Sequence, residues 1–245
     1  MESTTKIEIR EFRAGRTTPP DLAPNVVHVW SLPLESPGGL HAATEILSAD
    51  ERERAARFRA DEARNDFILT RAALRSLCAG YVRTASQDLQ FVVSTHGKPA
   101  LAGQRNLQFN VSHSHGLALL AFVREREIGV DVEKINPAPD ARKLAERFFS
   151  QVERAALEPL SGDELQSAFF RCWTRKEAYI KARGVGLSLP LDQFDVSLAA
   201  DSADALLATR PDSLDVQRWS VRNLAVHASY AAALALAENV NRKGS

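Results

Sequence analysis

Residues 47–52 read LSADER, and residues 149–154 read FSQVER. Both have the pattern Ser-x-x-Glu-Arg, in which a serine caps a helix and a glutamate three residues later closes a capping box. A helical pattern containing Thr-Arg follows each motif, and a turn with glycine and proline follows each helix. A repeat with a period of about 100 residues predicts two similar α+β lobes that divide near residue 108. Because capping boxes are common, a chance match between the two motifs is the alternative.

The patterns around the two motifs predict the remaining elements. Alternating and β-branched residues predict strands at 25–32 and from about residue 89, and the charged turn 124–127 predicts a hairpin between 116–123 and 127–135. The alanine-rich stretch 227–236 fits either a strand or a helix. We expect four segments: a flexible lead-in (1–22), an N-terminal lobe (23–108), a C-terminal lobe (109–238) and a flexible tail (239–245).

Composition excludes several classes of protein. The chain has 245 residues, and its 31 Lys and Arg equal its 31 Asp and Glu, so no overall field favours nucleic acid or an anionic membrane as a partner. The two cysteines, Cys78 and Cys172, lie far apart in no metal-like spacing, which predicts neither a disulfide nor a zinc site. No signal peptide is recognisable, and the apolar run from Tyr230 is too short to span a bilayer. We expect a cytoplasmic protein.

Two acids stand in the strand pattern IGVDVEKI, residues 128–135. Residues i and i+2 of a strand point to the same face, about 6.6 Å apart along the chain, so Asp131 and Glu133 project together. Two such carboxylates repel each other unless a cation lies between them. The simpler interpretation is a pair of solvated acids on an exposed face.

A second group lies in WTRKEAYIK, residues 173–181, where Trp173, Glu177 and Lys181 recur along one face of a helix. An ordinary surface Glu–Lys pair beside a packed tryptophan explains this spacing as well. Placed behind the strand acids, however, Glu177 would be a third oxygen ligand for a hard cation such as Mg²⁺. Lys181, one turn further on, could then reach the phosphates of a ligand.

A third group is FNVSHSHG, residues 109–116. Its His-x-His lacks the further ligands of a zinc hydrolase, whereas Asn110, Ser112 and Ser114 beside His113 suit a polar, anionic ligand. The glycines of ARGVGLSLP, residues 182–190, follow a helix rather than a strand, so they do not indicate a dinucleotide-binding loop.

Taken together, GKP (97–99), FNVSHS, IGVDVEKI, FFS and WTRKEAYIKARGVGLSLPL closely resemble the 4′-phosphopantetheinyl transferases of the Sfp type, over roughly residues 45–200. The resemblance implies an enzyme that moves the phosphopantetheine arm of coenzyme A to a serine of an apo acyl or peptidyl carrier protein. It also implies an α+β pseudo-dimer of two lobes, with the active site in the cleft between them. We therefore expect a monomer.

The resemblance also implies the site residues. The catalytic group would be Glu177, Lys181 and Asp131, and the Mg²⁺ ligands (Mn²⁺ could replace the ion) would be Asp131, Glu133 and Glu177. Residues expected to contact coenzyme A are Arg54, Arg71, Lys98, Pro99, Ser112, His113 and Lys181. One position departs from the family, because Glu51 stands where a basic residue is expected. Arg52, Arg57 or Arg71 could supply the missing contact with the 3′-phosphate.

The implied mechanism leaves some points open. The base that deprotonates the carrier serine would be Glu177 or a hydroxide held by the metal, while Lys181 would stabilise the departing phosphate. An acidic carrier protein predicts a basic and apolar docking patch within residues 144–165, and the family favours carriers of polyketide or nonribosomal-peptide synthases. The alternatives are a non-catalytic protein that binds coenzyme A or a carrier on the same scaffold, and a metal-dependent pyrophosphatase.

Overall fold

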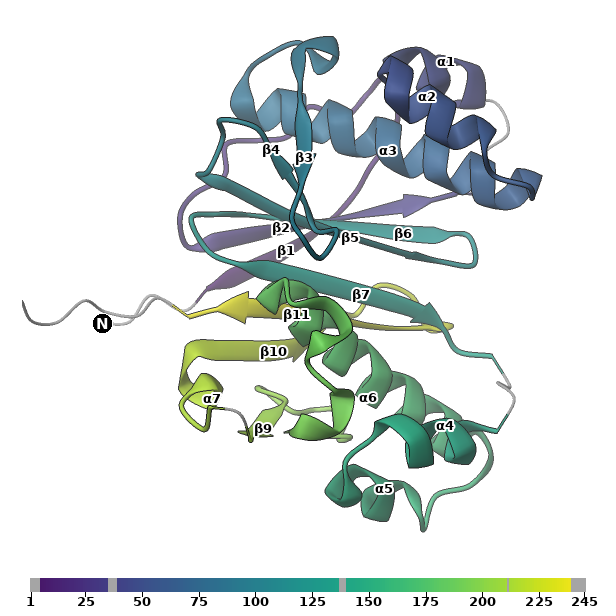
Figure 1. Cartoon of the computed structure of the whole chain (residues 1–245), viewed down its shortest axis with the longest axis vertical. Helices are drawn as coiled ribbons and strands as arrows, with labels where there is room; N and C mark the ends of the chain where they lie inside the picture. The colour runs from purple at the N-terminus through teal and green to yellow at the C-terminus, as the bar shows by residue number, and fades with distance from the viewer. Residues whose placement is uncertain (1–4, 35–38, 137–139, 211, 239–245) are drawn as a thin grey trace, which may run out of the picture. The chain divides into compact units, whose positions relative to one another are not determined.

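The computed structural model describes residues 5–34, 39–136, 140–210 and 212–238. The chain forms two compact units, residues 1–94 with 99–125 and residues 95–98 with 126–245 (Figure 1). The tip of one hairpin, Thr95–Lys98, thus packs within the second unit, although the strands on either side of it belong to the first. Within the described ranges, no helix has the length and apolar character needed to cross a membrane.

The first unit is a mixed sheet covered by helices. Its four-stranded sheet has the order β1-β2-β6-β5, in which only the β1–β2 pair is parallel. The strands are β1 (Lys6–Glu11), β2 (Val26–Pro33), β5 (Leu107–Ser114) and β6 (Leu117–Arg124), with the small hairpin β3 (Phe91–Val93) and β4 (Pro99–Leu101). The helices are α1 (Leu40–Ile46), α2 (Ala49–Ala56) and α3 (Asp61–Val82), and η2 (Ser86–Asp88) is a 3₁₀ turn. Leu74 and Leu77 of α3 form a core with Trp30, Phe109 and Phe122 of the sheet.

The second unit packs one long helix on an antiparallel sheet. Its three-stranded sheet has the order β10-β11-β7, with Asp131 of β7 opposite Ala233 of β11. The strands are β7 (Ile128–Lys134), β8 (Phe194–Val196), β9 (Leu206–Thr209), β10 (Trp219–Asn223) and β11 (Tyr230–Ala237). The helices are α4 (Ala141–Phe148), α5 (Gln151–Leu157), α6 (Gly162–Arg183) and α7 (Asp215–Arg218), with 3₁₀ turns η3 (Gly186–Ser188) and η4 (Leu191–Gln193). Figure 1 shows α6 along the face of this sheet.

A capping box with a buried glutamate organises each unit. In α2 the carboxylate of Glu51 accepts a hydrogen bond from the Ser48 amide (2.9 Å), and in α5 Glu153 does the same with Ser150 (2.9 Å). Both carboxylates are almost fully buried, with residue exposures of 4% and 1%. Both capping boxes predicted from the sequence are therefore confirmed.

Cations on the long helix of each unit neutralise these carboxylates. Glu51 binds Arg71 (2.5 Å) and Arg75 (3.1 Å) of α3, while Glu153 binds Lys176 of α6 (2.7 Å). Arg75 also donates to the carbonyls of Ser86 and Leu89, and Lys176 donates to those of Leu191 and Phe194. In both units the cation therefore joins the capped helix to the long helix and to the segment that follows it, as expected of a structural repeat.

Four expectations about the fold need correction or completion. Residues 6–11 form β1, rather than part of a flexible lead-in, because their alternating Ile7 and Ile9 pair in register with β2. The predicted hairpin does not form, because β6 pairs with β2 and β5 whereas β7 pairs with β11. For the same reason the compact units divide after Glu125, not at residue 108. Residues 230–237 are a strand, and the tail 239–245 lies outside the described residues.

We expect Glu51→Gln to lower the free energy of unfolding by on the order of 3 kcal/mol, because it leaves the buried Arg75 without its counter-ion. The measurement is chemical denaturation at neutral pH. Glu53→Gln on the same helix is the matched control, because the Glu53 side chain is 73% exposed and contributes little.

The same substitution also changes the response to acid. Burial alone would raise the pKa of Glu51, but the Ser48 amide, Arg71 and Arg75 outweigh burial and lower the pKa below its ordinary value of 4.5. A lowered pKa in the folded state stabilises the fold above pH 4.5, and this stabilisation is lost as the pH falls further. Wild-type protein should lose more stability than Glu51→Gln between pH 5 and pH 3, roughly the window set by such a shift. Parallel losses would contradict this account.

Candidate functional site

Strand β7 and helix α6 lie unusually close together, and Gly129 is the reason. A Cβ atom at this position would lie 2.1 Å from the carbonyl oxygen of Ala178 and 2.3 Å from the amide nitrogen of Ala182. The helix backbone therefore occupies the space that any side chain would need. Because side chains alternate along a strand, Asp131 and Glu133 lie on the face of β7 that carries Gly129, which is the face toward α6.

Helix α6 is held in one rotation by a block of buried polar residues. Arg175 donates to the carbonyls of Ser197 and Ala199 and to Asn223, and Lys176 binds Glu153 and two carbonyls. Both side chains are fully buried. The ring of Trp173 packs against Phe148, Phe149 and Phe169. These contacts give Trp173, Arg175 and Lys176 structural roles and fix the rotation of the helix on which Glu177 and Lys181 also lie.

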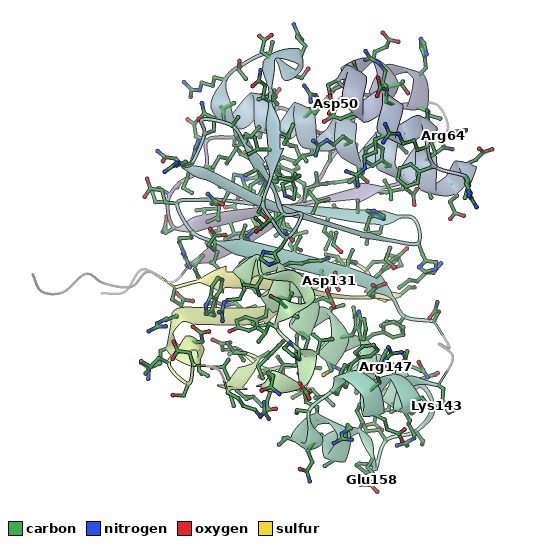
Figure 2. All side chains as sticks on the ribbon, viewed as in Figure 1. Asp50, Arg64, Asp131, Lys143, Arg147 and Glu158 are labelled. Carbon is green, nitrogen blue, oxygen red and sulfur yellow. The ribbon has the colours of Figure 1, made fainter. Side chains whose placement is uncertain are left out.

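Glu177 and Lys181 belong to the same site as the strand acids. The ammonium of Lys181 lies 2.6 Å from Oδ1 of Asp131, whose side chain is only 4% exposed. Asp131 sits at the junction of β7 and α6 within the second unit (Figure 2). A buried carboxylate does not fit the interpretation of the strand acids as a solvated pair. Lys181 itself is 30% exposed, so the site opens to solvent on its side.

The electrostatics of Glu177 place it near both strand acids. Burial raises its pKa, and the negative charges of Asp131 and Glu133 raise it further, whereas Lys181 opposes the change. Three carboxylates therefore share one region with the ammonium of Lys181, an arrangement that a divalent cation would stabilise. This all-oxygen donor set is of the kind that Mg²⁺ prefers. As they stand, no three His, Cys, Asp or Glu side chains in the described chain are close enough to form a finished coordination shell.

The expected coenzyme A residues on β5 point in two directions. Ser112 is buried on the polar face that it shares with Asn110 and Ser114, and His113 is exposed on the opposite face. His113 is close enough to Asp66 of α3 for its charge to lower the pKa of that carboxyl, although burial raises it overall. Consecutive residues on a strand therefore offer a ligand two different faces of β5.

Of the two arginines expected to contact coenzyme A, one is exposed and the other is in an ion pair within the protein. Arg54 is exposed, with its guanidinium 5.1 Å from the centre of the Phe67 ring. Arg71 binds Glu51 and lies 4.0 Å from the centre of the Phe91 ring. Glu51, which stands where the family has a basic residue, is thus a core counter-ion for Arg71 and Arg75.

The last two expected residues, Lys98 and Pro99, lie at the end of the β3–β4 turn. Pro99 begins β4, and Lys98 binds Glu127 and the carbonyl of Ala182. The structure thus gathers Asp131, Glu177 and Lys181 in the second unit, with Glu133 beside them. That these residues meet Arg54, Arg71, Ser112 and His113 in a cleft stays a prediction.

Neither Gly129 nor Glu127 is among the residues expected from the sequence to form the site. Gly129 did carry a signal, because an isolated glycine inside a strand pattern often marks a close approach of another backbone. Glu127 carried none, because its partner Lys98 lies 29 residues away.

Comparison with known proteins gives consistent matches along the chain. The family described as 4′-phosphopantetheinyl transferase superfamily matches residues 127–235, and the family 4′-phosphopantetheinyl transferase, N-terminal, matches residues 33–124. The 4′-phosphopantetheinyl transferase HetI of Nostoc sp. is 37% identical over 225 residues, 89% of this chain and 92% of that protein. The 4′-phosphopantetheinyl transferase Sfp of Bacillus subtilis is 35% identical over 64% of this chain and 68% of its own length. The crystal structure of Thermotoga maritima holo-[acyl-carrier-protein] synthase aligns with a TM-score of 0.36 at 22% identity, covering 46% of this chain and 62% of that one.

We expect Gly129→Ala to lower the free energy of unfolding by roughly 1–3 kcal/mol, the usual cost of overpacking a core. The new methyl group would collide with backbone atoms of Ala178 and Ala182, which cannot move without shifting the helix. Chemical denaturation measures the loss. A variant within about 0.5 kcal/mol of wild type, the range of neutral surface changes, would contradict the close approach of β7 and α6.

Proposed function

The chain belongs to the 4′-phosphopantetheinyl transferase superfamily, and we propose that Asp131, Glu133, Glu177 and Lys181 form its reaction centre. The activity is transfer of the 4′-phosphopantetheine group to carrier proteins. The observation that carries the proposal is the buried Asp131 carboxylate, held by Lys181 on one side and facing Glu177 of the same helix. Burying such a group of charges costs more free energy than an apolar arrangement would. Buried charges with shifted pKa values are concentrated at functional sites.

The reaction centre would hold Mg²⁺ through Asp131, Glu133 and Glu177. When bound, the ion withdraws negative charge from the pyrophosphate of coenzyme A. The protein side chains neutralise charge and accept the proton. Lys181, held beside Asp131, would contact the phosphate oxygens and neutralise the charge that grows on the leaving group. We assign Glu177 as the group that accepts the proton of the carrier serine, because it is the half-buried carboxylate next to Lys181.

The reaction is a single displacement at the β-phosphorus of coenzyme A. The serine oxygen forms a bond to the β-phosphorus of coenzyme A, and the bond between that phosphorus and the bridging oxygen breaks. Adenosine 3′,5′-bisphosphate leaves with the bonding electrons, and the serine proton passes to Glu177. The products are the holo carrier and the bisphosphate. Coenzyme A would also contact Arg54, Arg71, Lys98, Pro99, Ser112 and His113, as the family resemblance implies.

We expect Asp131→Asn and Glu177→Gln each to lower Mg²⁺-dependent transfer by roughly a hundredfold or more, the usual effect of removing a catalytic carboxylate. The assay incubates each variant with coenzyme A and an apo carrier and reads the mass of the carrier. Glu164→Gln, an exposed change on the same helix, is the control. Unchanged rates in both variants would overturn the proposed centre. Release of phosphopantetheine to water without a carrier would instead identify a pyrophosphatase, and binding without transfer a non-catalytic scaffold.

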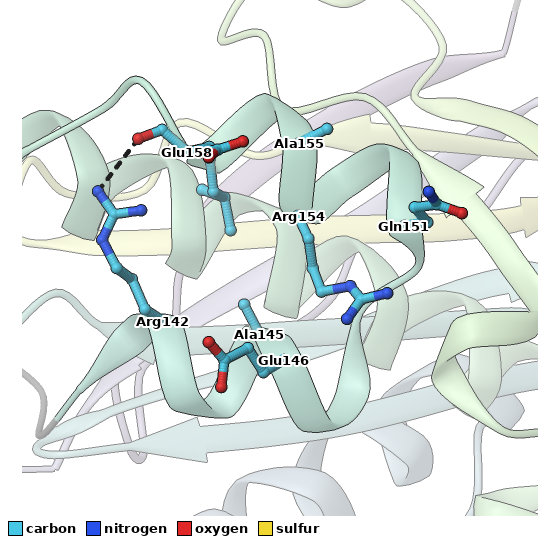
Figure 3. Close-up of a pocket in the computed structure, with 8 residues that line it drawn as sticks. Arg142, Ala145, Glu146, Gln151, Arg154, Ala155 and Glu158 are labelled. Atoms are coloured by element: carbon cyan, nitrogen blue, oxygen red, sulfur yellow. Dashed lines mark hydrogen bonds between the residues drawn. The ribbon is translucent and has the colours of Figure 1, made fainter.

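Helices α4 and α5 offer a docking surface for the carrier. A pocket of about 440 Å³ lies between them, lined by Arg142, Glu146, Arg154 and Glu158 among others (Figure 3). Figure 3 shows the Arg142 guanidinium donating a hydrogen bond to the backbone carbonyl oxygen of Glu158, whereas no hydrogen bond is drawn from Arg154 to the other residues shown. A second, more apolar pocket is lined by Arg147, Phe148 and Leu189. The Phe148 ring packs edge-on against Trp173, one turn before Glu177, and we infer that this surface borders the proposed centre.

The charge and exposure of this surface suit an acidic, amphipathic partner. Exposed basic residues outnumber exposed acidic ones along α4 and α5, and Asp140 is already paired with Lys143 at 2.6 Å. Val152 of α5 adds an apolar side chain with 59% exposure. We propose that the acidic recognition helix of the carrier lies here. Carriers of polyketide and nonribosomal-peptide synthases are the proposed substrates, and a panel that includes fatty-acid carriers tests that choice.

We expect Arg147→Glu and Arg154→Glu each to raise the KM for the carrier by roughly five- to tenfold, with the KM for coenzyme A unchanged. Reversing a charge at an interface repels an acidic partner without touching the bound substrate. Steady-state kinetics at low and high salt measure the effect, which should shrink as salt increases. Arg105→Glu, an exposed change in the first unit, is the control. Equal effects on the two KM values would place the defect elsewhere.

A further inference from the structure

Lys98 connects the start of β7 with the end of α6. Its ammonium lies 2.7 Å from a carboxylate oxygen of Glu127, the residue directly before β7, and 3.0 Å from the carbonyl oxygen of Ala182 in the last turn of α6. The Lys98 side chain is only 14% exposed. One side chain thus binds both elements that supply the acids and the ammonium of the proposed centre.

The contact with Ala182 is a helix cap. The last carbonyls of a helix have no partner within it, and a cation placed there satisfies a carbonyl and interacts favourably with the negative end of the helix dipole. Lys181 is in the same turn as Ala182, so an ordered last turn also sets the position from which Lys181 reaches Asp131.

The glycines after α6 lie beside this contact. Gly184 ends the helix with a φ of +65°, and a Cβ atom there would lie 3.4 Å from Cδ of Lys98. Gly186 has a φ of +56°, and a Cβ atom there would lie 3.6 Å from Cβ of His96. The turn that carries Lys98 therefore lies along the Gly184–Gly186 segment. The left-handed φ values at Gly184 and Gly186 account for the glycines of residues 182–190 without a nucleotide-binding loop.

We propose that Lys98 is a positioning residue, which caps α6 and ties it to the start of β7 so that Lys181 is held against Asp131. This inference rests on the proposed function only in taking Lys181 as part of the reaction centre. It extends the family-based expectation for Lys98, a direct contact with coenzyme A, because the ammonium already has partners in the protein itself. The carboxylate of Glu127 has a positioning role as well, because it binds the Lys98 ammonium.

Hydrogen exchange of the free protein, without coenzyme A or Mg²⁺, tests the cap directly. Lys98→Gln and Glu127→Gln should each speed exchange of the amides in residues 180–186 by roughly two- to fivefold, the range for losing a charged helix-end contact. Lys98→Arg should restore most of the protection, because a guanidinium can donate to both partners. Glu125→Gln, an exposed change two residues before Glu127, is the control. Unchanged exchange in both Lys98→Gln and Glu127→Gln overturns the proposal, whatever the enzyme does.

Kinetics separate a positioning role from a role in substrate binding alone. Glu127→Gln should lower kcat by roughly two- to fivefold with the KM for coenzyme A unchanged, because it loosens Lys181 without removing a charge that faces the substrate. Lys98→Gln should lower kcat in the same way, and Lys98→Arg should recover it. A rise in the KM for coenzyme A in Lys98→Gln, with wild-type kcat in Glu127→Gln, would assign Lys98 to the substrate alone and overturn the inference. The hydrogen-exchange measurement tests the helix cap even if the protein has no transferase activity.

Discussion

A carboxylate taken out of water must be matched by cations and hydrogen-bond donors, and each unit of this protein is arranged around one such carboxylate. Glu51 and Glu153 each close a capping box and bind a buried cation on the long helix that follows. The same cation also donates a hydrogen bond to a backbone carbonyl of the next segment. Three pieces of chain are thereby joined at one point, and an error in any of them would leave a buried charge unmatched.

In the second unit this constraint reaches the proposed reaction centre through the rotation of α6. With Lys176 bound to Glu153 and Arg175 bound to backbone carbonyls, the helix cannot turn without breaking buried hydrogen bonds. Glu177 and Lys181 then face β7, and Gly129 lacks the side chain that would keep the helix backbone away. Asp131 is buried by that approach and pairs with Lys181. The motif WTRKEAYIK therefore contains residues that fix the helix, Arg175 and Lys176, directly beside residues of the proposed centre, Glu177 and Lys181.

Local signals in the sequence predicted much of this arrangement. Both capping boxes, the end of α6 at Gly184 and the strand that carries Asp131 follow from patterns within a few residues, and the structure contains all of them. Pairings between distant segments were less accessible. The predicted hairpin between β6 and β7 was wrong, because each strand found a better partner far away in the chain. Strand β1 was missed because an exposed edge strand buries too little for a strong pattern.

By itself the sequence determined the kind of chemistry, because oxygen ligands, a lysine and a capped helix are properties of residue types and short spacings. It also carried the family signature that names the reaction. Tertiary structure alone decided which charges are structural. Glu51 and Glu53 are two residues apart on one helix, yet one is buried against two arginines and the other is exposed. Lys98, Lys176 and Lys181 are likewise indistinguishable as residue types. They differ because packing gives Lys98 a helix end, Lys176 the buried Glu153 and Lys181 the strand acid Asp131 as partners, and contacts between distant segments leave no local trace in a sequence.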